Sequence, residues 1–243
     1  MTLAQYRDSC QHDRQIRVPT RRGCEVIPSF LFRPERSSRL HPDAVHISRK
    51  SSRHQVVYRL TRAVKFPDQN NAEAAIQALD DGLCLTLQKF PFLAGVLSLA
   101  GDGSGRLQLQ YPADLTDRSL TKGLFGAKQI LVDDFPHPYE TLKKAGMPPS
   151  AFKSATFLPD DFANWQGVPA NGEGICDFEV SDAPVMRVQA CFIPGGLVLS
   201  IYVHHSVLDF HGISTFWESL AANVSHVARA HGSRDMDPGN IQH

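Results

Sequence analysis

Residues 197–212 read LVLSIYVHHSVLDFHG, and the hydrophobic period of the sequence changes within this stretch. From Leu197 to His204 apolar side chains fall on every second position, which predicts a buried β-strand. From Gly212 to His231 the spacing becomes three and four, which predicts a helix that ends at Gly232. The apolar face of that helix is formed by Ile213, Phe216, Trp217, Leu220, Val224 and Val227. A last strand, a polar turn and a last helix are therefore expected in this order.

Two more strands are predicted upstream of this junction. Residues Val185 to Ile193 form a strand, and the turn Pro194-Gly195-Gly196 connects it to the strand that ends at His204. Residues Gln55 to Val64 are rich in β-branched and aromatic side chains and end before Pro67, so they predict a further strand.

One long helix is predicted in the first half of the chain. Apolar residues recur at helical spacing from Asn71 to Phe90, Asn70 or Asn71 can cap the start, and Pro91 ends the helix. The longest apolar stretch, Leu83 to Ala100, is interrupted by a lysine and by Pro91, which argues against a membrane span. We therefore expect a helix end followed by a strand within this stretch.

The middle of the chain is rich in turn residues. A Gly-rich turn predicts a hairpin between Phe92–Leu99 and Arg106–Tyr111, and because it joins two strands it does not resemble a phosphate cradle. Residues 121–182 contain many prolines with aromatic residues between them, which indicates an ordered surface crossover with short helices such as Tyr139 to Ala145.

Composition excludes several classes of protein. The 243 residues include 25 basic and 25 acidic side chains and are 42% hydrophobic, which is neither a disordered composition nor that of a cationic binder of nucleic acid or anionic membranes. Residues 1–11 lack an apolar core, so no secretory signal is expected. Five scattered cysteines without ligand spacing predict buried reduced thiols, no structural zinc and a cytosolic location.

The turn after the last strand holds the residues that predict chemistry. A histidine at the end of a buried strand is costly unless its nitrogens find partners, and alternation places His204 and His205 on opposite faces. An imidazole with a reference pKa of about 6.5 suits proton removal near neutral pH. Asp209 can brace the turn by hydrogen bonds. Two alternatives stay open: a structural histidine pair with a helix-capping aspartate, or metal ligation that includes His211.

These residues resemble a known family. The pattern His205-xxx-Asp209, preceded by His204, is similar to the HHxxxD(G) motif of CoA-dependent acyltransferases, which include BAHD enzymes, fungal trichothecene 3-O-acetyltransferase-like enzymes, chloramphenicol acetyltransferase and condensation domains. The segment Phe90–Leu97 resembles the family's P-x-L-A-G-R-L segment, and Ala183–Phe192 resembles the strand that leads to the motif. Tyr139–Leu142 and Ala145–Ser150 look most like the fungal branch, and a role in secondary metabolism is expected from this resemblance.

The resemblance implies an α/β (α+β) two-layer sandwich of the chloramphenicol-acetyltransferase type, with a mixed sheet covered by helices. It implies that His205 is the general base, that Asp209 gives structural support, and that His204 and Gly212 neighbour them in the motif. Acyl-CoA is the implied co-substrate and a small-molecule hydroxyl or amine the acceptor, with no metal, nucleic acid or membrane partner. We expect a polar lead-in over residues 1–50, an N-terminal-type acyltransferase domain over 51–232 and a frayed tail over 233–243.

The sequence departs from the family pattern in two places. Phe210 stands where a motif glycine is usual, with Gly212 two positions late, and a positive φ at position 210 would strain a phenylalanine. The sequence also lacks the DFGWG-like motif of the second domain. Two functions are therefore predicted as alternatives: an acyltransferase that acts alone, as a homo-oligomer or with a missing C-terminal domain, or a non-catalytic N-terminal half that binds a ligand or partner.

Overall fold

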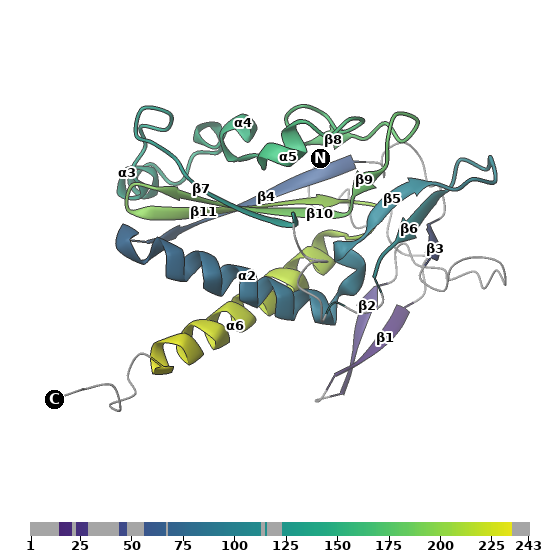
Figure 1. Cartoon of the computed structure of the whole chain (residues 1–243), viewed down its shortest axis with the longest axis horizontal. Helices are drawn as coiled ribbons and strands as arrows, with labels where there is room; N and C mark the ends of the chain where they lie inside the picture. Colours follow the sequence, from purple (N-terminus) through teal and green to yellow (C-terminus); the bar gives the residue numbers. More distant parts are fainter. Residues whose placement is uncertain are drawn as a thin grey trace.

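The structure is a computed structural model that describes residues 15–20, 23–28, 44–47, 56–66, 68–112, 115 and 123–234. It is an α/β fold with a mixed β-sheet and helices, in agreement with the expected class (Figure 1). Two long helices lie against one face of the main sheet, and a crossover with short helices lies against the other (Figure 1).

The main sheet has five strands in the order β7-β10-β11-β4-β8. Strand β10 pairs antiparallel with β11, β11 with β4 and β4 with β8, whereas β7 runs parallel to β10. Their bounds are β4 Val56–Lys65, β7 Phe125–Gln129, β8 Gly174–Ile175, β10 Met186–Ile193 and β11 Gly196–His204. The three strands predicted from period and composition are confirmed, and β7 and β8 come from the segment expected to consist of loops and short helices.

A second sheet has four strands in the order β3-β6-β5-β9, all antiparallel. Its members are β3 Ala44–Ile47, β5 Val96–Leu99, β6 Leu107–Gln110 and β9 Ala183–Pro184, and a separate antiparallel pair is formed by β1 Gln15–Thr20 and β2 Gly23–Pro28. The expected hairpin is confirmed as β5 and β6. Its first strand starts later than predicted, because Pro91–Ala94 form the 3-10 helix η3.

Helix α2, Ala72–Lys89, is the helix predicted in the first half of the chain. Its start differs from the expectation: Asn71 occupies the N-cap position, but its side chain makes no capping bond. Instead, Asn71 Nδ2 donates to Asp68 Oδ2 at 2.7 Å and Asn70 N to Asp68 Oδ1 at 3.0 Å, which holds the short 3-10 helix η2, Gln69–Asn71. Asp68 therefore organises this helix start.

Helix α6, Phe210–Arg234, is longer than predicted at each end. It begins two residues before Gly212 and continues through Gly232, so the predicted stop at that glycine is wrong. Helices α2 and α6 cross closely at Gly82, where an added Cβ would lie 2.8 Å from the backbone N of Val224. At the same crossing Asn223 Nδ2 donates to Thr86 Oγ1 at 2.9 Å.

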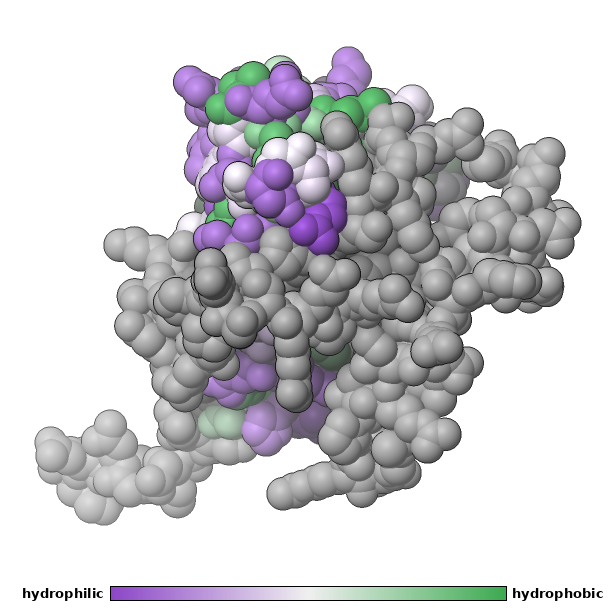
Figure 2. Space-filling model, turned by 90° about the vertical axis from the view of Figure 1, so that its right-hand side faces the viewer, coloured by the Kyte–Doolittle hydropathy of each residue, from purple (hydrophilic) through white to green (hydrophobic). Residues whose placement is uncertain are grey.

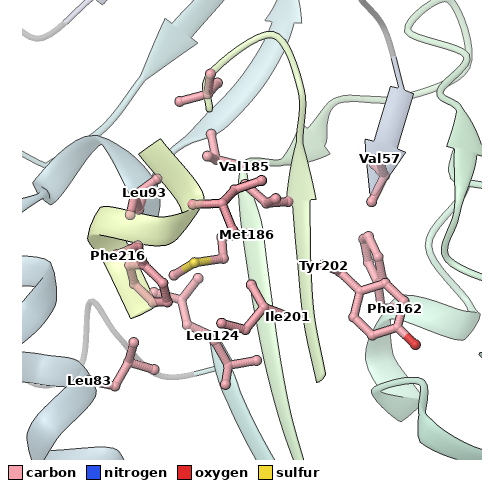
Figure 3. Close-up of a cluster of buried hydrophobic side chains, with 14 of the residues drawn as sticks. Val57, Leu83, Leu93, Leu124, Phe162, Val185, Met186, Ile201, Tyr202 and Phe216 are labelled. Atoms are coloured by element: carbon pink, nitrogen blue, oxygen red, sulfur yellow. The ribbon is translucent and has the colours of Figure 1, made fainter. Parts of the chain in front are cut away.

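The core lies between this helix pair and the main sheet. Figure 3 shows Met186 and Ile201 on the helix side of the sheet, together with Leu83 and Phe216 from the helices. Tyr202, the residue after Ile201, points to the opposite side toward Phe162 (Figure 3), with ring centroids 5.5 Å apart. Strand β11 is buried along its whole length, so its two faces are covered.

The crossover covers the second face of the main sheet. It carries α3 Tyr139–Lys144, the 3-10 helix η5 Pro149–Ala151, α4 Ser154–Phe157 and α5 Asp160–Ala163, so the expected ordered segment with a short helix near Tyr139 is confirmed. Its aromatic side chains Phe135, Phe157 and Phe162 are buried. Arg187 on β10 donates to Asp161 at 3.1 Å and lies 5.0 Å from the Trp165 ring, which ties the crossover to the sheet.

The surface and the cysteines agree with the composition. In the described part of the face seen in Figure 2, hydrophilic residues predominate and hydrophobic residues form small groups. No helix in the described part is both long and apolar enough to span a bilayer. Cys84, Cys176 and Cys191 are buried thiols, as predicted, and burial raises the pKa of Cys176 and Cys191 to about 12. Cys10 and the side chain of Cys24 lie outside the described residues, as does the predicted tail beyond Arg234.

Candidate functional site

The turn between β11 and α6 is anchored on two neighbouring strands. His204 N donates to Val185 O at 2.8 Å, just before β10, and His205 N donates to Val56 O at 2.8 Å on β4. Val207 N then donates to His204 O at 3.0 Å, which closes the turn. The two histidines therefore lie at a position that is determined by the sheet on each side.

The His204 side chain is fully buried under the crossover. Ser206 N donates to its Nδ1 at 3.2 Å, and the Phe178 ring packs against it with centroids 5.4 Å apart. Burial, followed by the nearby His205 charge, lowers the pKa of His204 to about 3. His204 is therefore a neutral residue that orders the turn from inside.

The His205 side chain is partly exposed and has a defined hydrogen bond. Its Nδ1 lies 3.0 Å from Leu208 O. Because a carbonyl oxygen can only accept, Nδ1 carries the proton and Nε2 is the basic nitrogen of the neutral ring. The Tyr58 ring meets the imidazole edge to face, with centroids 4.8 Å apart and planes at 81°. This arrangement can remove a proton from a group that approaches Nε2.

The Asp209 side chain caps helix α6. Its Oδ1 accepts from Gly212 N at 2.7 Å, and its backbone O accepts from Ile213 N at 3.0 Å. A carboxylate at this end of the helix also interacts favourably with the helix dipole. Within the described part of the chain, the hydrogen bond of the Asp209 carboxylate thus goes to Gly212 N at the start of α6 and not to the His205 imidazole.

Phe210 fits the turn without strain. It is the first residue of α6, and among the described residues Met147 is the one non-glycine with a positive φ. The concern that position 210 requires a glycine is therefore wrong, because the chain there is already helical. Phe210 is 68% exposed. Gly212 lies in the first turn, where an added Cβ would meet Leu208 Cδ2 at 2.7 Å.

The structure adds two groups that sequence reasoning missed: the Leu208 carbonyl and the Tyr58 ring. A backbone carbonyl has no signature in the sequence, and Tyr58 reaches His205 through strand pairing between β4 and β11. Within the described ranges no three His, Cys, Asp or Glu side chains are grouped as metal ligands.

The chain matches a family model described as the trichothecene 3-O-acetyltransferase-like N-terminal domain, over residues 56–223. It is 27% identical over 169 residues to the trichothecene 3-O-acetyltransferase of Saccharomyces cerevisiae, covering 68% of this chain and 33% of that one. It is 28% identical over 148 residues to TRI101 of Fusarium sporotrichioides, covering 60% and 29% respectively. The chain thus spans about a third of the length of these curated relatives.

Two solved structures share the fold. The crystal structure of Fusarium graminearum TRI101 complexed with ethyl coenzyme A gives a TM-score of 0.57 at 18% identity, covering 72% of this chain and 36% of that one. The crystal structure of F. sporotrichioides TRI101 complexed with coenzyme A and T-2 gives 0.55 at 20% identity, covering 71% and 36%.

Proposed function

Because the chain belongs to the trichothecene 3-O-acetyltransferase-like N-terminal domain family, we propose that it carries the general base of an acyl-CoA-dependent acyltransferase. The acceptor is a hydroxyl, or an amine, of a small molecule. The observation that carries this proposal is the partly exposed His205, whose Nδ1 is bonded to Leu208 O at 3.0 Å. Structural neighbours complexed with coenzyme A and with T-2 support the choice of co-substrate and acceptor class.

The proposed reaction uses the basic nitrogen of His205. Nε2 takes the proton of the acceptor hydroxyl as its oxygen attacks the thioester carbonyl of acyl-CoA, which forms a tetrahedral intermediate. The intermediate collapses, the carbon–sulfur bond breaks, and the CoA thiolate takes the proton from the imidazolium. The products are the acylated acceptor and free CoA, and no acyl-enzyme forms.

The other motif residues support this base. The Asp209 bond to Gly212 N holds the start of α6, and the buried His204 accepts from Ser206 N, so the turn that presents His205 is fixed at its two ends. In this scheme Asp209 and His204 act on the turn rather than on the substrate. Acyl-CoA is a co-substrate, and no metal takes part.

Assembly and setting complete the proposal. We propose that the site works together with a second domain or with another copy of the chain, since the relatives are about three times as long as the matched region. A cytosolic location, a fungal source and a role in secondary metabolism stay predictions from the sequence.

The test is acyl transfer from acetyl-CoA, followed as release of free CoA thiol in the presence of hydroxyl acceptors. Replacement of His205 by alanine should lower the rate by about 10²- to 10⁴-fold, since a general base contributes that much. The matched control is His226→Ala, an exposed histidine of α6, which should keep the wild-type rate. Equal rates for wild type and His205→Ala would refute the proposal for this chain.

A non-catalytic binding function is the second candidate. It is favoured by large apolar side chains that are exposed on the elements next to the turn, namely Tyr58, Ile175 and Phe210. A chain of this kind would bind CoA or an acceptor in calorimetry while wild type and His205→Ala release thiol at the same background rate.

A further inference from the structure

The Tyr58 side chain has an unusual combination of exposure and contact. It lies on β4 opposite Val203 of β11, and its side chain is 43% exposed. Its ring nevertheless meets the His205 imidazole edge to face, with centroids 4.8 Å apart. A solvent-exposed aromatic ring that contacts the proposed base is placed to influence the orientation of its imidazole.

The His205 imidazole is oriented in part by a hydrogen bond to the backbone. It stands in a turn beyond the last residue of β11, and the bond from Nδ1 to Leu208 O defines one edge of the ring. Rotation about the Cβ–Cγ bond would break this bond and exchange the positions of the ring atoms. The Asp209 carboxylate is bonded to Gly212 N, so it orients the helix start.

We propose that Tyr58 is a positioning residue that holds the His205 ring with Nδ1 on Leu208 O and Nε2 toward the acceptor. The proposal rests on the function proposed above. Edge-to-face aromatic pairs prefer one mutual orientation, so the Tyr58 ring opposes rotation of the imidazole. The phenol hydroxyl is not needed for this, because the contact is made by the ring.

The predicted effect on catalysis is on kcat. If the full interaction energy of such a ring pair serves to orient the imidazole, loss of the pair lowers kcat by about 2- to 10-fold. Tyr58→Ala should show this loss with an unchanged KM for acetyl-CoA, and Tyr58→Phe should keep the wild-type rate. The matched control is Val64→Ala, which truncates a half-exposed residue of the same strand whose register partner is Leu197.

A spectroscopic test is independent of turnover. Long-range ¹H–¹⁵N spectra report which imidazole nitrogen is protonated, and the His205 signals are assigned by their loss in His205→Ala. Wild type, Tyr58→Phe and Val64→Ala should show the Nδ1–H form, whereas Tyr58→Ala should show a mixture of the two tautomers. Tyr58→Leu, which keeps an apolar side chain without the ring, serves if the alanine variant does not fold, and it should show the same mixture.

The outcomes separate this inference from the proposed function. If wild type and His205→Ala have equal rates, the proposed function fails, and the tautomer spectra still decide whether Tyr58 orients the ring. If Tyr58→Ala or Tyr58→Leu keeps the wild-type tautomer, the positioning role is overturned. A Tyr58→Phe variant as impaired as Tyr58→Ala would also overturn it, since the hydroxyl would then be the active group.

Discussion

The buried His204 imidazole makes the stability of the fold depend on pH. The side chain is fully buried, accepts from Ser206 N and packs on Phe178, and burial lowers its pKa from 6.5 to about 3. In the unfolded chain the imidazole titrates near its ordinary value of about 6.5. Between these two pKa values the unfolded state binds a proton that the folded state does not bind, so the free energy of unfolding falls as pH decreases from about 6.5 toward 3.

The size of the effect follows from the unfolded state. At pH 5 protonation favours the unfolded chain by a factor of about 30, or about 2 kcal/mol, as long as the folded pKa stays well below 5. At pH 7.5 the contribution is close to zero. A change of about 2 kcal/mol is a large part of a domain's usual free energy of unfolding, roughly 5–15 kcal/mol, so it is readily measured.

The perturbation is His204→Asn, in which the amide oxygen can still accept from Ser206 N but no proton is taken up. This variant is expected to be less stable than wild type at pH 7.5, because a smaller side chain leaves space beside Phe178. Urea unfolding at pH 7.5 and pH 5 is then compared between the two proteins. Wild type should lose about 2 kcal/mol more than His204→Asn over this interval.

A matched substitution controls for the other titrating groups. His226→Asn makes the same chemical change at an exposed position of α6, so its pH dependence should follow wild type. Equal losses of stability for wild type and His204→Asn between pH 7.5 and 5 would refute the reasoning, because they would mean that His204 binds its proton equally in the two states.

Substitutions at two further positions test the placement of α6. Asp209→Ala removes the acceptor for Gly212 N and should lower the free energy of unfolding by about 1 kcal/mol. Asp209→Asn keeps an acceptor oxygen and should recover most of this loss. Thermal unfolding measures the two variants, and equal losses would count against the cap. Gly82→Ala should lower the free energy of unfolding by about 1–3 kcal/mol, because the added Cβ would lie 2.8 Å from Val224 N. This loss is expected although alanine is the better helix former by about 1 kcal/mol. A higher unfolding midpoint in urea would contradict the close crossing.

The regular elements were predictable where a single period persists. Strands β4, β10 and β11 and helix α2 agree with the sequence pattern to within about one residue, because apolar alternation or helical spacing runs through each of them. Strand β7 was missed, since its residues FGAKQ include no β-branched side chain. Its place depends on parallel pairing with β10, which no local pattern reports.

The ends of elements were less predictable than their interiors. Helix α6 starts at Phe210 because Asp209 bonds the first turn, and a glycine inside a helix weakens it without ending it, so Gly232 does not stop it. Likewise η3 replaces the expected start of the first hairpin strand after Pro91. Such boundaries depend on single hydrogen bonds between specific atoms.

The local sequence pattern is enough to predict that two adjacent histidines end a buried strand on opposite faces and that Asp209 precedes a helix. These properties depend on neighbours within a few residues, so local periodicity is sufficient to predict them. Which histidine is buried, and which is partly exposed with its Nδ1 on Leu208 O, follows only from contacts made in the folded chain. Phe178 from the crossover covers His204 and Tyr58 from β4 meets His205, and such desolvation and ring contacts come from residues that only folding brings together.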